Sequence, residues 1–230
     1  MGPQAVPSLI SVTPRMAIGW RRASTSVPVP LMDGPRYISE MTYSTPALQG
    51  YCAAAAGHPF HGPYHDEEYG FPVTDDDELF ERLVLEMNQA GLSWLTILKK
   101  KDTFRQAYDG FDLTKVAGYG EADQARLLAD AGIIRNALKV DAAIHNAGQI
   151  LKIQNSHGSF AGWLVSHHPK PKVEWVRLFK DNFRFTGSEI TGEFLMSVGY
   201  LPDAHDPNCP VHARILDLDP PWAQVESGRP

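Results

Sequence analysis

Cysteine is nearly absent from the chain: only two of its 230 residues are cysteines. So few cysteines exclude a small scaffold held together by several disulfides. Long hydrophobic runs are absent too, and without a stretch of roughly 18 apolar residues we expect no membrane-spanning helix. An excess of basic residues is also missing, because the formal net charge is −6. That charge excludes a large, non-specific nucleic-acid-binding protein, which would be basic, but it does not exclude a local basic patch.

Strand signals are scarce, whereas helical signals fill the middle of the chain. No long run alternates between apolar and polar residues, and no Asn-Gly or Asp-Gly turn lies between two such runs. Hydrophobic residues make up 43% of the chain, which is enough for a core, and they recur at helical spacing. We therefore predict a single all-α domain over residues 49–214. The expected helices cover 77–90, 93–109, 112–120, 121–132, 135–153, 159–167, 172–179 and 187–198.

The two ends of the chain differ from this helical middle. Residues 1–48 are rich in Pro, Ser and Gly and have no helical or strand period. We expect a disordered leader, or a start codon assigned upstream of a true start at Met41, and a transit peptide is an alternative. No convincing secretory signal is present, so we expect a cytoplasmic protein. Residues 215–230 are Pro-rich and are expected to form a loose tail.

Each of the two cysteines has a histidine nearby, which indicates a metal site. His65 follows Cys52 by thirteen residues, and three residues separate His205 from Cys209. A Cys2His2 set suits tetrahedral zinc, and it would join the first and last segments of the domain. With all four positions filled by protein, such a zinc ion would be structural rather than catalytic. Two buried free thiols or one disulfide remain alternatives.

A carboxylate interrupts the apolar face of one predicted helix. Glu86 lies between Leu83 and Ala90 on that face, and Glu is rarely fully buried without a partner. A salt bridge would explain it, but so would a recognition carboxylate in a pocket. The upstream stretch HPFHGPYHDEEYG is dense in rings, and Trp94 follows closely. These rings could form ordinary core, or they could wall a pocket that binds a planar cation.

The stretch LLADAGIIRNALK predicts two helices joined by a short turn. Gly132 could adopt a positive φ there and let the backbone approach a ligand closely. The next helix begins near Arg135, with Asn136 and Lys139 in its first turn, and a helix N-terminus can bind a phosphate. An ordinary helical hairpin is the alternative. Lys99, Lys100 and Lys101 form a basic run that we expect to be a solvated helix end.

Three stretches together resemble the 3-methyladenine DNA glycosylase I family. They are YCAAAAGHPFHGPYHDEEYGFPVTDDDELFERLVLEMNQAGLSWLTILKK, AGIIRNALK, and FRFTGSEITGEFLMSVGYL with the later H-x3-C pair. The resemblance implies an all-α, helix-hairpin-helix glycosylase with one structural zinc ion per chain. It also implies release of N3-methyladenine from double-stranded DNA by a monomer, with the base flipped into an aromatic pocket.

The resemblance assigns roles to individual residues. Glu86 is the implied catalytic and base-recognition residue. The implied base-binding rings are Tyr64, Tyr69 and Trp94; the implied DNA-binding residues are Gly132, Ile133 and Arg135; the implied zinc ligands are Cys52, His65, His205 and Cys209. The chain departs from the family pattern at several positions: Tyr69 and Ala54 each replace a Trp, Asn88 and His61 also differ, and the chain reads EMNQAGLSW rather than EGQQAGLSW. These departures put the range of accepted bases in doubt more than the reaction.

The expected reaction is base release without strand cleavage, leaving an abasic site. N3-methyladenine in DNA is positively charged and is already a good leaving group. No lysine lies in the hairpin where lyase-type relatives carry their nucleophile, and we assign no role to Asp141, the nearest aspartate. Two alternatives stay open. The chain could be a zinc-clipped module that binds lesions without releasing a base, or a zinc hydrolase with another substrate.

Overall fold

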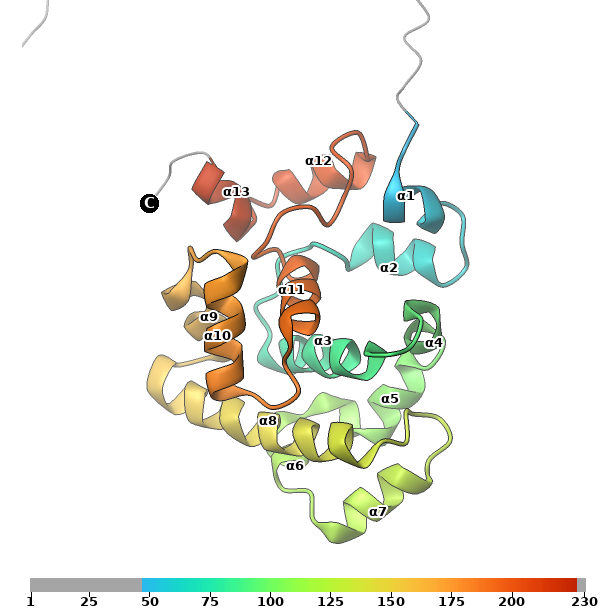
Figure 1. Cartoon of the computed structure of the whole chain (residues 1–230), viewed down its shortest axis with the longest axis vertical. Helices are drawn as coiled ribbons and strands as arrows, with labels where there is room; N and C mark the ends of the chain where they lie inside the picture. Colours follow the sequence, from blue (N-terminus) through green and yellow to red (C-terminus); the bar gives the residue numbers. More distant parts are fainter. Residues whose placement is uncertain (1–46, 227–230) are drawn as a thin grey trace, which may run out of the picture. The chain divides into compact units, whose positions relative to one another are not determined.

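The computed structural model describes residues 47–226, and these fold into helices joined by loops, with no strand among them (Figure 1). Most of the leader expected over residues 1–48, including Met41, lies outside the described residues. Among the described residues, no helix is both long enough and apolar enough to cross a membrane. The all-α prediction is therefore confirmed for this part of the chain.

Thirteen α-helices and one short 3-10 helix make up the described residues. They are α1 (Gly50–Ala55), α2 (His61–Glu67), α3 (Asp76–Gln89), α4 (Trp94–Leu98), α5 (Lys101–Ala107), a 3-10 helix (Asp109–Phe111), α6 (Leu113–Ala117), α7 (Glu121–Ala129), α8 (Ala137–His157), α9 (Phe160–His167), α10 (Lys172–Asn182), α11 (Ser188–Ser197), α12 (Pro210–Leu216) and α13 (Pro221–Glu226).

Side-chain caps set several of these boundaries. The Asp75 carboxylate accepts a hydrogen bond from the backbone N–H of Glu78 and caps the start of α3. Ser93 caps α4 in the same way. The single helix predicted over 93–109 is wrong, because the backbone leaves helical geometry at Lys100 and α5 begins anew. No Gly or Pro marks that break in the sequence.

Helix α3 is the centre of the core. It packs against α11 and α8, and ten consecutive residues, Leu79–Asn88, are buried (Figure 1). Rings from α9, α10 and α11 extend the core: Phe160 stacks on Phe194, and Phe179 packs against both Phe194 and Trp175. Because the middle of α3 is buried on nearly all sides, three of its charged side chains lie inside the protein: Glu81, Arg82 and Glu86.

The loose tail predicted over 215–230 is wrong in the part that the structure describes. Helix α12 continues to Leu216, and α13 follows. The backbone N–H of Trp222 donates to the carbonyl of Gly199, and its ring lies 5.8 Å from that of His212. Proline misled the prediction, because Pro221 occupies the first position of α13, where a helix tolerates proline.

Candidate active site and metal centre

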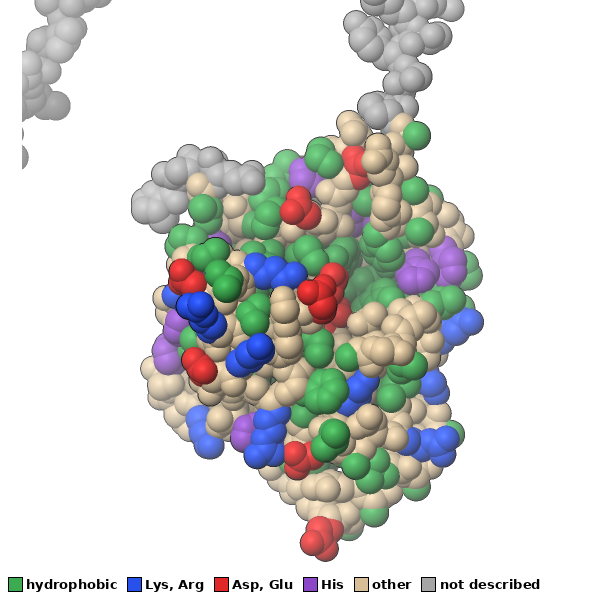
Figure 2. Space-filling view, in the orientation of Figure 1, with side chains coloured by type: hydrophobic (Ala, Val, Ile, Leu, Met, Phe, Trp, Pro, Cys, Tyr) green, Lys and Arg blue, Asp and Glu red, His purple; other side chains and the backbone are tan. Residues whose placement is uncertain are grey.

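A cavity of about 800 Å³ opens between α11, the end of α3, the start of α4 and the aromatic segment around α2. On the surface it is a hydrophobic hollow with acidic side chains at one edge (Figure 2). Its volume lies within the range of small-molecule sites. The lining residues are Tyr51, Tyr64, Tyr69, Glu86, Gln89, Ala90, Gly91, Trp94, Gly187, Ser188, Glu189, Ile190 and Glu193.

Four rings form the aromatic side of this cavity. The three predicted rings meet there: Tyr64 lies 5.1 Å from Trp94 and 5.6 Å from Tyr69, measured between ring centroids. Tyr51, which the sequence analysis did not single out, packs edge-on against Tyr69 at 5.5 Å. Its position next to Cys52 is the signal that could have identified it, because a metal ligand fixes its neighbours. Such a wall is suited to a flat, electron-poor ring.

Glu86 lies inside the cavity with no partner of its own. Its side chain is 5% exposed, and among the described residues it forms no hydrogen bond or ion pair. The nearest cation is Arg82, but the Arg82 guanidinium pairs with Glu68 at 3.2 Å and Glu78 at 3.0 Å. The alternative of a structural salt bridge at Glu86 therefore finds no support in the geometry. An unpaired buried carboxylate is a costly group for a folded protein to keep.

Burial raises the pKa of Glu86 from 4.5 to about 8, with the nearby Glu193 adding to the rise and Arg82 opposing it. In the empty cavity at neutral pH the group is thus mostly protonated. The same burial raises the pKa of the Tyr51 and Tyr64 hydroxyls, and the Glu86 charge raises both further. The cavity consequently resists negative charge until a positive partner arrives.

A second carboxylate, Glu193, faces the same cavity from α11. The Tyr69 hydroxyl donates to the Oε2 atom of Glu193 at 3.2 Å. Burial and the Glu193 charge together raise the pKa of Tyr69, so this hydroxyl keeps its proton and stays a donor. The sequence analysis missed Glu193, because a lone Glu in a helix carries no signal without knowledge of which face it lies on.

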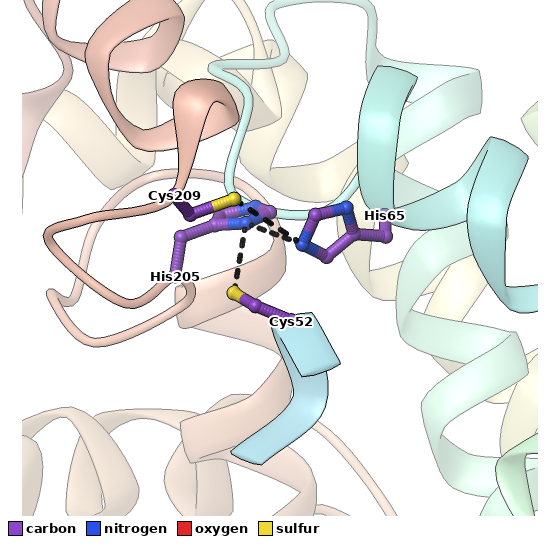
Figure 3. Close-up of side chains that lie close together, drawn as sticks. All are labelled: Cys52, His65, His205 and Cys209. Carbon is purple, nitrogen blue, oxygen red and sulfur yellow. Dashed lines mark hydrogen bonds between the residues drawn. The ribbon is translucent and has the colours of Figure 1, made fainter. Parts of the chain in front are cut away.

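The four predicted metal ligands come together in one buried cluster (Figure 3). Their ligand atoms all lie within 4.8 Å of one another. The His65 Nε2 atom is 3.1 Å from His205 Nδ1 and 3.7 Å from Cys209 Sγ, while Cys52 Sγ is 3.7 Å from His205 Nδ1. The cysteines form no disulfide. Two thiols and two imidazoles converging on one point fit a tetrahedral metal ion.

The groups behind the ligands are arranged as a metal site requires. The His65 ring nitrogen that points away from the cluster contacts the Asp66 carboxylate at 2.7 Å, and that of His205 contacts the Tyr69 carbonyl at 2.7 Å. Such contacts fix which ring nitrogen is free to bind metal. The backbone N–H of Asp206 donates to Cys52 Sγ at 3.2 Å, which favours a thiolate. The donor set therefore fits a structural ion.

The metal cluster and the cavity share a wall. Tyr51 directly precedes Cys52, Tyr64 directly precedes His65, and the Tyr69 carbonyl accepts from His205. Three of the four cavity rings are thus attached to backbone that the cluster holds in place. The cluster lies too deep in the protein to contact an occupant of the cavity, but it determines where that occupant's aromatic neighbours lie.

The predicted hairpin joins α7 to α8, but the backbone of Gly132 does not have the predicted conformation. Gly132 does not have a positive φ. Glycine is needed there because an added Cβ would lie 2.9 Å from the Asp130 carboxylate and 3.0 Å from Thr103. The Ile133 side chain is buried in the core, so only its backbone can reach a ligand, whereas Arg135 is exposed.

Two lysines hold the hairpin to the rest of the domain. Lys100 donates to the Ala131 carbonyl at 2.7 Å, so it is not the freely solvated residue that we expected. Lys139 is buried, and its ammonium donates to the carbonyls of Asn88 and Ala90 at 2.9 and 2.8 Å. Lys139 therefore connects the first turn of α8 to the carboxyl end of α3, at the rim of the cavity.

Comparison with known proteins gives a consistent set of relatives. Residues 54–212 match a family model described as methyladenine glycosylase. The chain is 35% identical over 171 residues to DNA-3-methyladenine glycosylase 1 of Escherichia coli (strain K12), which covers 66% of this chain and 91% of that protein. A relative from Haemophilus influenzae, named DNA-3-methyladenine glycosylase, is 34% identical over 166 residues, covering 64% of this chain and 89% of that protein.

Solved structures agree with the sequence relatives. A crystal structure of a variant of 3-methyladenine DNA glycosylase I in complex with 3-methyladenine matches with a TM-score of 0.64 and 34% identity, covering 71% of this chain and 97% of that one. The Staphylococcus aureus 3-methyladenine DNA glycosylase I, whose structure addresses 3-methyladenine recognition, matches with a TM-score of 0.63 and 35% identity, covering 70% and 95% of the two chains.

Replacing one cluster cysteine tests the metal site. We expect protein purified without chelator to contain about one metal ion per chain, and Cys209→Ser to lose both the ion and roughly 10 °C or more of melting temperature, because the ion contributes folding energy. Elemental analysis and thermal unfolding on the same preparation measure both. Metal-free wild-type protein with a normal melting temperature would contradict the site.

Glu86→Gln tests the cost of the buried carboxyl. Because the folded pKa of about 8 exceeds the ordinary 4.5, the contribution of Glu86 to stability is fully present below pH 4.5 and is lost as the pH rises towards 8. Glutamine cannot ionise, so the variant should exceed the wild type by a margin that grows from pH 5 to pH 8, reaching roughly 4–10 °C in melting temperature. The exposed Glu67→Gln is the control. A Glu86→Gln protein less stable than the wild type at pH 8 would restore the salt-bridge explanation.

Proposed function

The chain belongs to the methyladenine glycosylase family, and from that premise we propose that it is a DNA glycosylase that hydrolyses the N-glycosidic bond of N3-methyladenine in DNA. The free base would leave, and an abasic site would remain. The observation that carries the proposal is the unpartnered Glu86 carboxyl in an aromatic cavity. Relatives that match at 34–35% identity are 3-methyladenine DNA glycosylases, one of them solved with 3-methyladenine bound.

The cavity supplies what a flipped, methylated adenine requires. Extruding a base from the duplex costs a few kcal/mol, and a damaged base costs least. Ring faces of Tyr64, Tyr69 and Trp94 contribute roughly 0.5–2 kcal/mol each towards a cationic base. Glu86 accepts a hydrogen bond from the amino edge of the adenine, and the positive ring favours its ionised form. Base binding at neutral pH therefore releases a proton from Glu86.

The reaction requires the protein mainly to position the base and the sugar. The methylated base is cationic in DNA and leaves without a strong acid, so Glu86 acts by holding the base. Water attacks C1′ as the glycosidic bond breaks through an oxocarbenium-like state. Asp141 is not assigned to stabilise that state, because it lies exposed and pairs with Arg184 at 2.8 Å.

The α7–α8 hairpin is the proposed DNA-binding element, of the helix-hairpin-helix type. Arg135 is exposed at the turn and can contact a phosphate. The backbone N–H groups of Gly132 and Ile133 donate to Asp130, so these two residues are proposed to shape the turn that meets the DNA. The chain as a whole is acidic, so binding of a monomer to double-stranded DNA would depend on this local surface and fall with added salt.

The ion in the four-ligand cluster is proposed to be zinc, one per chain. Cys52, His65, His205 and Cys209 would fill all its positions, so no water would be activated there. This filled site argues against a zinc hydrolase. A lesion-binding module without base release is the remaining alternative, and only the two departures from Trp at Ala54 and Tyr69 favour it.

A base-release assay separates the enzyme from the binding module. We expect the wild type to release 3-methyladenine from methylated duplex DNA, as measured by chromatography of the freed bases. Glu86→Gln should slow release ten- to hundredfold, because one charge-assisted hydrogen bond is lost. Glu67→Gln should match the wild type. Tight binding of methylated DNA without any freed base would instead establish the binding module.

Borohydride treatment tests whether the strand is cut. Lys139 is the one lysine near the hairpin whose burial lowers the pKa of its amine, as a Schiff-base nucleophile would require. Its ammonium is nevertheless held by two carbonyls and does not line the cavity. We therefore expect intact strands with abasic sites and no covalent adduct after reduction. An adduct that disappears in Lys139→Met would show lyase chemistry.

A further inference from the structure

Three carboxylates line the proposed base pocket, those of Glu86, Glu189 and Glu193, whereas recognition of one amino edge needs only one. The Glu189 side chain is largely exposed to solvent, so Glu86 and Glu193 are the two less accessible carboxylates. Glu86 lies at the bottom, on α3, and Glu193 faces it from α11 across the same cavity. Among the described residues, Glu193 forms no ion pair with a cation. The nearby Lys172 lies against Gly192 and its ammonium is 4.0 Å from Glu189, not from Glu193.

The surroundings of the two carboxylates make the cavity selective for positive charge. Arg82 is the cation nearest to Glu86, and its charge is already shared by Glu68 and Glu78. The rings that complete the lining also present negative faces to a bound cation. A partly desolvated site that holds Glu86 and Glu193 without an ion-paired cation in the described part of the chain favours an occupant that carries positive charge.

Glu193 is held in place for this role by a neighbour. The Tyr69 hydroxyl donates to Oε2, and the Oε1 atom of the same carboxylate has no hydrogen-bond partner among the described residues, so it is available to an occupant. Tyr69 is one of the two positions where this chain departs from the Trp of the family pattern. The Tyr69 hydroxyl and the Glu193 carboxylate therefore form one hydrogen-bonded pair on the wall of the pocket.

We propose that Glu193 is a specificity-determining residue, and that its carboxylate, held by Tyr69, selects purine bases with a positively charged ring over neutral bases of the same shape. The proposal rests on the proposed function and divides the recognition into two parts. Glu86 accepts a hydrogen bond from the edge of the base, which a cation and its neutral isostere share, and it also responds to the ring charge. Glu193 reads the ring charge, which only the cation has.

Two free ligands of one shape test this division. The first is the 3,9-dimethyladeninium ion, which carries a permanent positive charge like the base in DNA. The second is its neutral isostere, in which a carbon replaces the methylated N3. Tryptophan fluorescence or calorimetry gives both dissociation constants at pH 8. The measured quantity is the ratio of the two affinities.

The variants should change this ratio in distinct ways. In Glu193→Gln we expect the preference for the cation to fall roughly tenfold or more, while the affinity for the isostere changes little. Tyr69→Phe, which keeps the ring and removes the hydroxyl, should lower the preference by a smaller factor. Glu86→Gln should weaken the binding of both ligands. Glu67→Gln should reproduce the wild type.

The outcomes distinguish this inference from the proposed function. If the wild type releases 3-methyladenine from DNA but Glu193→Gln and Tyr69→Phe both keep the wild-type ratio, Glu193 does not read charge and the function stands. If the wild type binds neither ligand and releases no base, the proposed function fails and the inference fails with it. Thermal unfolding of each variant confirms that the ratio is measured on folded protein, and Tyr69→Phe carries the test alone if Glu193→Gln does not fold.

Discussion

The convergence of four ligands from opposite ends of the domain is the constraint on which the pocket depends. Helices α1 and α2 have only six and seven residues, too few to be stable alone. Around the cluster, the local apolar core consists of little more than the two cysteines, Val211 and Ile215. The cysteine and histidine contacts, rather than a large apolar core, therefore stabilise this part of the domain. They also fix the positions of Tyr51 and Tyr64.

The rest of the fold supplies the stability that offsets the free-energy cost of burying the unpaired Glu86 carboxyl. Glu86 lies in a helix in which its sequence neighbours Leu85 and Met87 are buried, and α11, which carries Glu193, is anchored in the ring-rich core by Phe194 stacked on Phe160. The aromatic wall is attached to backbone that the metal cluster holds in place, and Glu86 lies on a buried helix. Such a site is organised before the ligand arrives, which reduces the cost of binding.

Sequence patterns predicted what depends on local chemistry. The carboxylate in the apolar stripe and the Cys–His spacing pointed to side chains that the structure places in the cavity and in one cluster. Sequence patterns failed where the role of a residue depends on contacts with residues distant in the sequence. The role of Gly132 comes from contact with Thr103, and no local pattern reveals that Glu193 lies opposite Glu86. The helical tail was missed because proline can begin a helix as well as exclude one.

The attachment of Lys139 to two backbone carbonyls has a consequence for sequence change. Any residue at positions 88 and 90 offers the same carbonyl oxygen, so the side chains there can vary without loss of the contact. Only the lysine is constrained, because no other side chain offers three donors on a stem of that length. Evolution can therefore alter the rim of the pocket without detaching it from the helix that follows the hairpin.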